Sequence, residues 1–200
     1  MLAPLAGRVE VAGRQVRPGA FLPEAALVFQ EAEDQLFCPT LGEDVAFGAR
    51  NRGLAGAALE ARVADALAAC GLTGLADRPV HRLSGGEKRR ACIAGALAMA
   101  PRLMLLDEPS AGLDLRSRRR LIELLAGAGQ GLLIASHDLE LVLELCPRVI
   151  LIDGGRVRAD GPARRVLGDR ALMEAHGQEA PHSLVPHDPP RHRHRPAGTA

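Results

Sequence analysis

Two carboxylates, Asp107 and Glu108, directly follow the apolar stretch Leu103 to Leu106. Such a stretch predicts a buried strand, and α/β proteins bind ligands at the carboxyl ends of parallel strands. One carboxylate at that place can hold Mg²⁺, directly or through its waters, while the other can orient or deprotonate a water that attacks a γ-phosphate. The pair is therefore typical of phosphoryl transfer, although a surface helix that starts after a buried strand would give the same pattern.

A second segment, Leu83 to Glu87, combines a serine with two glycines ahead of an alanine-rich run that ends at Met99. Ser84 stands where a helix N-cap is expected. Gly85 and Gly86 lack a Cβ, so backbone N–H groups can approach a phosphate closely, and the helix dipole favours an anion there. The pattern predicts a phosphate contact at a helix N-terminus, and a capped helix with a glycine-rich entry is the alternative.

Together these two segments resemble motifs of the ABC ATPases. Leu83 to Glu87 is similar to the ABC signature LSGGQ, with Glu in place of Gln, and Leu103 to Glu108 resembles Walker B. Three more segments resemble the Q-loop, the D-loop and the switch-histidine motif, in the order of the family: Val28 to Gln30, Ser110 to Asp114, and Ser136 to Asp138. The resemblance runs from about Gly7 to Leu167.

The resemblance implies an α/β fold of the P-loop NTPase type, in which a parallel-sheet core carries a helical signature subdomain. It also implies an ATPase with ATP and Mg²⁺ as cofactors. Asp107 would then bind Mg²⁺, and Gln30 would contact Mg²⁺ or the attacking water. Glu108 would orient or deprotonate that water, and His137 would hydrogen-bond the γ-phosphate, as an imidazole can at physiological pH.

Members of this family close two ATPase subunits head to tail around two ATP molecules. The resemblance therefore implies a second ABC ATPase subunit as partner, the same chain or a different one. Ser84, Gly85 and Gly86 would face the nucleotide that the second subunit holds, and Asp114 would cross the interface.

Within the family, Asp34 to Phe37 and Gly42 to Gly48 resemble the energy-coupling-factor and cobalt/nickel import ATPases. This implies a cytoplasmic subunit, peripheral on the inner face of the membrane, that energises uptake of cobalt, nickel or a vitamin through a transmembrane coupling subunit. We expect the segment after Gln30 to contact that subunit through four apolar side chains, although these could instead pack the helical subdomain against the sheet: Leu36, Phe37, Val45 and Phe47.

The phosphate loop, G-x-x-x-x-G-K-[ST], does not occur in the 200 residues, and the only lysine, Lys88, lies in the signature helix. Gly7 to Val11 resembles the family segment that follows the phosphate loop and the first helix. We therefore expect an N-terminally truncated domain without Walker A, which hydrolyses no ATP alone. The alternative is a degenerate, non-hydrolysing partner that lends its signature motif to another ATPase subunit.

The rest of the pattern indicates the elements that place these motifs. Helical periodicity covers the region from Leu41 to Cys70, and Asp114 to Ala126 is amphipathic. Apolar strands alternate with helices, which predicts a parallel sheet covered on both faces. The predicted strands are 25–29, 103–106 and 132–135, and a short helix is predicted at 139–145. Hairpins are predicted at 7–17 and 149–158.

Composition excludes several other classes. With 47% hydrophobic and 24% charged residues, a net charge of +1 and neither Trp nor Tyr, the chain is globular and offers little to a nucleic acid. A chromosome-maintenance or repair ATPase shares the motifs but carries long coiled-coil insertions, and no heptads occur here. The four cysteines are too far apart for a metal clip, so we expect reduced thiols.

Residues 1–176 are predicted to form the ATPase domain. Gly177 to Ala200 holds five of the 14 prolines and few apolar residues, which predicts a disordered tail. Imidazoles in this tail could bind Ni²⁺ or Co²⁺, but arginines alternate with several of them, and their charge favours a solvated tail. These imidazoles belong to His182, His187, His192 and His194.

Overall fold

Three short apolar segments form a parallel sheet: β3 (Ala25–Val28), β4 (Leu103–Asp107) and β5 (Gly131–Ala135), in the order β3-β4-β5. Val28 pairs with Leu106, and Leu106 pairs with Ile134. This register brings the carboxyl ends of all three strands to one edge of the sheet. The sequence motifs that follow these strands are therefore neighbours in space.

The computed structural model describes residues 6–17 and 19–185. They belong to two units, Met1–Leu141 and Val142–Ala200, each of which is described by itself. The first unit begins with a small antiparallel hairpin of β1 (Glu10–Val11) and β2 (Arg14–Gln15), as the sequence predicts. The sheet and four α-helices follow.

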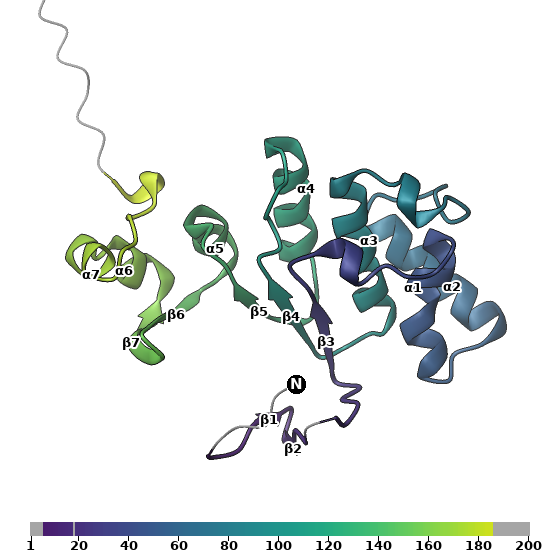
Figure 1. Ribbon diagram of the computed structural model, residues 1–200, viewed down its shortest axis with the longest axis horizontal. Helices are drawn as coiled ribbons and strands as arrows, with labels where there is room; N and C mark the ends of the chain where they lie inside the picture. The colour runs from purple at the N-terminus through teal and green to yellow at the C-terminus, as the bar shows by residue number, and fades with distance from the viewer. Residues whose placement is uncertain (1–5, 18, 186–200) are drawn as a thin grey trace, which may run out of the picture. The chain divides into compact units, whose positions relative to one another are not determined.

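Three helices of the first unit gather beside the sheet: α1 (Leu41–Asn51), α2 (Gly56–Ala69) and α3 (Gly85–Ala98) (Figure 1). Thr40 and Glu43 form a capping box that starts α1, because each side chain accepts a hydrogen bond from the backbone of the other. A Cβ at Gly48 would lie 2.6 Å from Cγ of Met99, so glycine lets α1 approach the end of α3 closely. Short 3₁₀ turns, η1 (Ala32–Asp34) and η2 (Val80–Arg82), precede α1 and α3.

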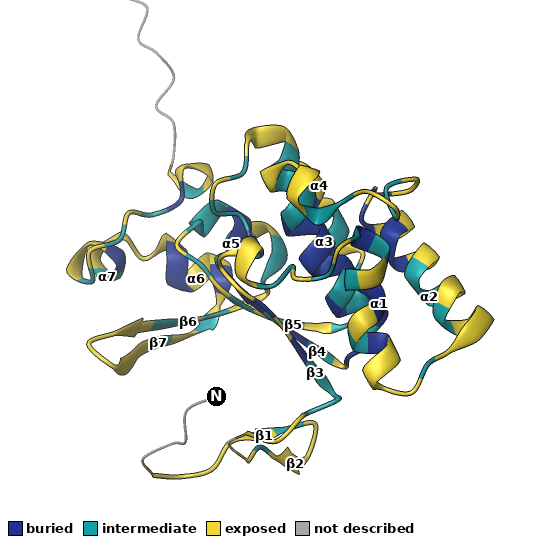
Figure 2. Ribbon diagram, turned by 45° about the vertical axis from the view of Figure 1, so that its right-hand side comes forward, coloured by how far each residue is buried: buried dark blue, intermediate teal, exposed yellow. Residues whose placement is uncertain are grey.

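The fourth helix, α4 (Leu115–Ala126), starts at Asp114, whose carboxylate accepts the N–H of Ser117 at 2.7 Å. Its buried face carries Leu121, Ile122 and Leu125. The buried residues of the first unit concentrate on α3 and the helices around it, drawn dark blue in Figure 2. The largest side chains of this core that are buried almost completely are Val28, Leu41, Val45, Leu72, Ile93, Met104, Leu106, Leu121, Leu125 and Leu141.

The two faces of the parallel sheet differ, which corrects the prediction that helices cover both. Met104 and Leu106 are buried on one face, whereas Leu27 and Leu133 on the other are 45% and 58% exposed. Leu27, Leu105 and Leu133 are register neighbours across the three strands and form an open sheet face. Apolar strand sequence indicates that a face is apolar, but it does not supply the element that covers it.

The helix α5 (Leu139–Leu145) runs across the boundary between the two units. The second unit is built on an antiparallel hairpin of β6 (Arg148–Asp153) and β7 (Arg156–Pro162), on which Arg148 pairs with Asp160 at 2.6 Å. Two short helices follow, α6 (Ala163–Gly168) and α7 (Arg170–Ala175), and Leu167 and Met173 are buried.

Of the predicted tail, the structure describes residues 177–185, which include the 3₁₀ turn η3 (His182–Leu184). His187, His192 and His194 lie outside the described residues. No helix within the described residues has both the length and the apolar character needed to cross a bilayer.

Candidate functional site

The carboxyl edge of the sheet brings together three of the predicted motifs. Gln30 lies two residues past the end of β3, Asp107 ends β4 with Glu108 directly after it, and Ser136 and His137 directly follow β5. Asp107 pairs with Ala135 in the strand register, so the acidic pair and the histidine come from adjacent strands. Motifs far apart in the sequence thus share one edge, which is where parallel sheets bind ligands.

The Glu108 carboxylate is held by the segment that follows β5. Its Oε1 accepts the backbone N–H of His137 at 3.0 Å and lies 2.8 Å from Nδ1 of the His137 ring. Its Oε2 accepts the hydroxyl of Ser136 at 3.2 Å. The backbone of Glu108 has a φ of +44°, a left-handed conformation that is rare for a residue with a side chain. A carboxylate with three partners therefore stands on a strained turn.

Electrostatics couple Glu108 to His137. The hydrogen bond and the charge of Glu108 raise the pKa of the His137 imidazole above its ordinary value, and the charge of Asp138 adds a smaller effect in the same direction. The His137 side chain is 76% exposed, whereas that of Glu108 is 19% exposed. The imidazole is thus accessible from solvent while the carboxylate that it contacts is mostly covered.

Gln30 is positioned through its backbone by a buried arginine of the signature helix. Arg89, which is 5% exposed, donates from one Nη to the carbonyl of Phe29 at 2.6 Å and from the other to the carbonyl of Gln30. Gln35 holds the same segment from another side, because it accepts the N–H of Phe29 at 3.0 Å and donates to the carbonyl of Leu27. The side chain of Gln30 itself is left exposed at the edge of the sheet.

Asp107 suits a divalent cation, because it is an exposed carboxylate at the end of a strand. No cluster of three or more His, Cys, Asp or Glu residues within the described chain could hold a metal ion by itself. A cation at Asp107 would therefore need further oxygens from water or a ligand, as Mg²⁺ has when it binds with a nucleotide.

The signature residues and Asp114 form a second group, which the structure does not bring into the group at the sheet edge. Ser84 caps α3: its Oγ accepts the N–H of Glu87 at 3.3 Å, and Glu87 accepts the N–H of Ser84 at 2.8 Å. A Cβ built on Gly85 would meet nothing within 4 Å, whereas one on Gly86 would lie 2.9 Å from Oγ of Ser117 on α4. The signature thus presents an open helix N-terminus beside the start of α4.

Glu87, which stands where the signature of the family has Gln, keeps its charge at this helix start. The backbone N–H of Ser84 is the main cause that lowers the pKa of Glu87, and the guanidinium of Arg78, 3.4 Å away, acts in the same direction. A carboxylate at a helix N-terminus is favoured by the dipole.

Lys88 has a partner of its own. Its ammonium forms an ion pair with Glu33 on η1, and the Lys88 side chain is 18% exposed. The only lysine of the 200 residues therefore connects α3 to the segment after Gln30.

The four apolar residues predicted to receive a membrane partner do not share one environment. Phe37 and Phe47 are 63% and 42% exposed, and their rings meet edge to face with centroids 4.8 Å apart. Leu36 is half-buried. Val45 is fully buried in the face of α1 that packs on α3, so its prediction as a partner contact was wrong.

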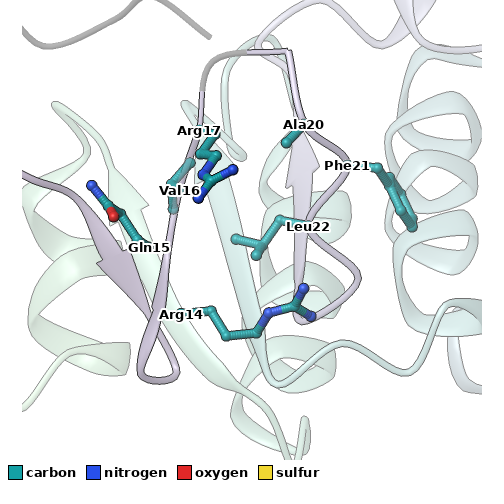
Figure 3. Close-up of a pocket in the computed structure, with 7 residues that line it drawn as sticks. All are labelled: Arg14, Gln15, Val16, Arg17, Ala20, Phe21 and Leu22. Carbon is teal, nitrogen blue, oxygen red and sulfur yellow. The ribbon is translucent and has the colours of Figure 1, made fainter.

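A cavity of about 380 Å³ lies between the β1–β2 hairpin and the segment before β3. Arg14 and Leu22 extend into the space between these segments, whereas Phe21 points away from it (Figure 3). Arg14 forms an ion pair with Glu24 at 2.7 Å. None of the predicted site residues lines this cavity.

Comparison with known proteins decides the family. Residues 1–111 match the ABC transporter family. A relative from Gloeobacter violaceus, whose name describes an ABC transporter ATP-binding protein, is 50% identical over 189 residues, which are 92% of this chain and 78% of the relative. This chain belongs to the ABC transporter ATP-binding family.

Other relatives of this ABC chain are longer than it. A Synechocystis relative with the same kind of name is 50% identical over 184 residues, which are 92% of the chain but 65% of the relative. The cobalt import ATP-binding protein CbiO of Rhodobacter capsulatus is 52% identical over 158 residues, which are 78% of the chain and 56% of CbiO.

Among solved structures, CbiO1 of Clostridium perfringens, described as part of the ABC transporter complex CbiONQ, superposes with a TM-score of 0.76. It is 33% identical, and the match covers 88% of this chain and 73% of CbiO1. The predicted fold class, an ABC ATPase with a parallel sheet and helices, is confirmed.

Several residues around the site escaped the sequence interpretation. Arg89, Arg118 and Ser136 all touch the segments that carry predicted site residues. Ser136 could have been singled out, since it stands in the Ser136 to Asp138 motif. The two arginines carried no signal of their own, because the chain has 25 basic residues and spacing alone does not show which of them contact the site segments.

Proposed function

We propose that this chain is the ATP-binding and ATP-hydrolysing subunit of an ABC-type importer of the energy-coupling-factor kind. The observation that carries the proposal is the edge of the sheet, where Gln30, Asp107, Glu108 and His137 lie at the ends of three parallel strands. Glu108 is held there by three hydrogen-bond partners.

The hydrogen bonds of Glu108 suggest which oxygen acts as the base. Oε1 is occupied by the ring and the backbone N–H of His137, while Oε2 is paired with Ser136. A carboxylate oxygen has two lone-pair sites, so Oε2 keeps one with which to orient a water or to accept its proton. Glu108 is the proposed general base.

His137 contributes a donor that is both exposed and charged over a wider pH range than a free histidine. With Nδ1 facing Glu108, the opposite ring nitrogen, Nε2, can donate to a phosphate oxygen. Gln30 would place its amide near the same oxygens, on a backbone that Arg89 fixes. These groups bind and orient, whereas Glu108 accepts the proton.

Asp107 and Gln30 are the proposed ligands of Mg²⁺, and both are exposed oxygen donors. The bound cation would neutralise charge on the phosphate oxygens. The residues present suit the γ-phosphate end of ATP, but the 200 residues contain no phosphate-loop motif for the other phosphates, and Lys88 is paired with Glu33.

Ser84, Gly85 and Gly86 are proposed to contact ATP held by a second ABC ATPase subunit, with Asp114 at the interface. In support, the N-terminus of α3 is open at Gly85.

The membrane partner is proposed to be a transmembrane coupling subunit that contacts Phe37 and Phe47. The chain would then lie on the cytoplasmic face of the membrane. The relative named for cobalt import makes a cobalt or nickel ion the first solute to test, with a vitamin as the alternative. Two exposed aromatic rings next to the Gln30 segment support this choice of contact.

The proposal is tested with a chimera in which a Walker A segment from the Synechocystis relative precedes residue 1. We expect Mg²⁺-dependent ATP hydrolysis by the chimera and none by the 200 residues alone, because the lysine and the backbone cradle of the phosphates are then supplied. A folded chimera that binds ATP without hydrolysing it would contradict the catalytic assignment.

A second candidate function is a non-hydrolysing partner that lends its signature to another subunit. The observation that favours it is the pairing of the only lysine with Glu33, together with an open signature helix. In that case the 200-residue chain would restore turnover to a CbiO protein whose own signature is mutated, while the chimera would stay inactive. Gly85→Asp should abolish the restoration, and Gly129→Asp serves as control, because Gly129 is exposed and a Cβ there would meet nothing within 4 Å.

A further inference from the structure

Asp138 is the centre of a cluster that joins three segments of the first unit. Arg118 on α4 donates from Nε to Oδ2 at 2.6 Å and from Nη2 to Oδ1 at 2.8 Å, a two-pronged pair. Ser110 donates its hydroxyl to Oδ2 at 3.0 Å, and Leu141 donates its N–H to Oδ1 at 3.0 Å. Arg118 and Asp138 are each about one fifth exposed.

This cluster continues directly into the group around Glu108. The N–H of Asp138 donates to Oγ of Ser136 at 3.0 Å, and the same oxygen donates to Glu108. Ser110 lies two residues after Glu108. The Asp138 carboxylate thus connects the loop that carries Glu108, through Ser110, with the segment that carries His137.

The backbone of Glu108 needs such support. A positive φ at a residue with a side chain is strained and persists where neighbouring contacts determine it. Its own N–H bonds the carbonyl of Ala135 at 2.9 Å, and its carbonyl accepts the N–H of Ala111 at 3.1 Å. Contacts to the β5 side and to the loop after β4 together fix this turn.

We propose that Arg118 and Asp138 are positioning residues for Glu108 and His137: they clamp residues 136–138 to the loop after β4 and so fix the orientation in which Ser136 and His137 hold the Glu108 carboxylate. The catalytic meaning of this arrangement rests on the function proposed above. The positioning itself is a property of the chain without nucleotide.

The charges fit this arrangement. The hydrogen bonds from Arg118 are the main cause that lowers the pKa of Asp138, to about 2, so Asp138 is an anion across the physiological range. The groups that raise the pKa of His137 are Glu108 and, less strongly, Asp138. Arg118 itself contacts Asp138, the residue next to His137 in the chain.

The experiment uses Arg118→Met in the 200-residue chain, observed by NMR without nucleotide. We expect the His137 pKa to fall toward about 6.5, because the ring leaves Glu108. We also expect the amide of His137 to exchange with solvent at least about 10-fold faster, since it loses its carboxylate acceptor. If Arg118 acted on His137 through its charge alone, removing that charge would raise the His137 pKa. The positioning proposal predicts that the pKa falls, so the sign of the change distinguishes the two explanations.

Arg119→Met is the matched control, because it removes the same charge from the same helix, where Arg119 pairs with Glu123. It should leave the pKa and the amide exchange of His137 unchanged. In Arg118→Lys, the His137 pKa and amide exchange should lie between those of the unchanged protein and those of Arg118→Met, since an ammonium cannot form the two-pronged pair.

An unchanged or raised His137 pKa in folded Arg118→Met overturns the proposal. If that variant does not fold, Ser110→Ala carries the same test, because it removes one of the side-chain donors to Asp138, and no change in amide exchange at His137 would then overturn it. None of these readouts involves ATP, so a failure of the ATPase proposal would be seen separately in the chimera.

Discussion

Glu108 illustrates what sequence can and cannot predict for one residue. Its place after an apolar strand, beside Asp107, made it a candidate for water activation, and the structure places it at the sheet edge with His137. The left-handed backbone of Glu108 and the hydrogen bond from Ser136 to its carboxylate had no sequence signal, because both depend on residues 28 positions apart meeting in space.

The general-base role predicts the behaviour of Glu108→Gln. In the chimera that carries a Walker A segment, the amide can still hydrogen-bond a water but cannot accept its proton. Steady-state hydrolysis should fall at least about 100-fold, while ATP binding measured by calorimetry is retained. Glu123→Gln, an exposed change on α4, is the control, and near-normal hydrolysis by Glu108→Gln would remove Glu108 from the reaction.

The contact between His137 and Glu108 also predicts a pH dependence of stability. The pKa of His137 is raised in the folded chain, so the contribution of its positive charge is fully present below the unfolded pKa of about 6.5. It is lost as the pH rises through the folded value. The difference in free energy of unfolding between the protein and His137→Gln should therefore be larger at about pH 6 than at about pH 8.5.

Urea denaturation at both pH values measures this difference. Glu108→Gln provides the control, because without the carboxylate the His137→Gln change should have nearly the same effect at both pH values. A difference that grows with pH would contradict the sign of the shift.

The order and kind of the main helices and strands could be predicted, because each follows a local signal. Ser84 and Asp114 cap the helices that begin after them, and apolar runs mark β4 and β5. Which face of α1 is buried was harder to predict. Val45 and Phe47 are two positions apart, so on a helix they point to different sides, and only Val45 reaches the core.

The exposed and buried side chains on and before α1 therefore give a prediction about the partner contact, with the buried Val45 as its control. Phe37→Ser and Phe47→Ser together should change the free energy of unfolding little, because both rings are largely exposed. They should weaken co-purification of the chain with the transmembrane subunit of its importer. Val45→Ala should instead destabilise the chain by about 2 kcal/mol, the usual effect of removing buried methyl groups, without a specific effect on the partner.

Denaturation and affinity co-purification from cells that contain both subunits distinguish these outcomes. If the double Phe variant unfolds, or if it co-purifies at full yield, the two rings belong to the packing of the helical region and the coupling surface lies elsewhere.

The open sheet face is the feature of the fold that could not be predicted from the sequence. Apolar strands predict a parallel sheet buried on both sides, and only the structure shows that Leu27 and Leu133 stay accessible. Among the residues that the structure describes, the strand order β3-β4-β5 also leaves β5 at an outer edge of this sheet. Apolar side chains on an edge strand favour association between copies of a chain.

We therefore expect the 200-residue chain to self-associate with rising concentration, as measured by sedimentation velocity. Leu133→Thr should reduce this association, because it keeps a side chain suited to a strand and makes the surface polar. Leu115→Thr is the control, since Leu115 is 87% exposed but lies at the start of α4. Equal association of the two variants would show that the open sheet face is not responsible.

The pairing of Lys88 with Glu33 has a practical consequence for chemical labelling. Because the 200 residues hold one lysine, an amine-reactive reagent can modify only this side chain and the N-terminal amine. The ammonium must release Glu33 and lose its proton before it reacts, so the labelling rate records how often this ion pair opens. Apart from the N-terminal amine, the sequence thus provides one labelling site, which reports on the contact between α3 and the segment after Gln30 with no substitution needed.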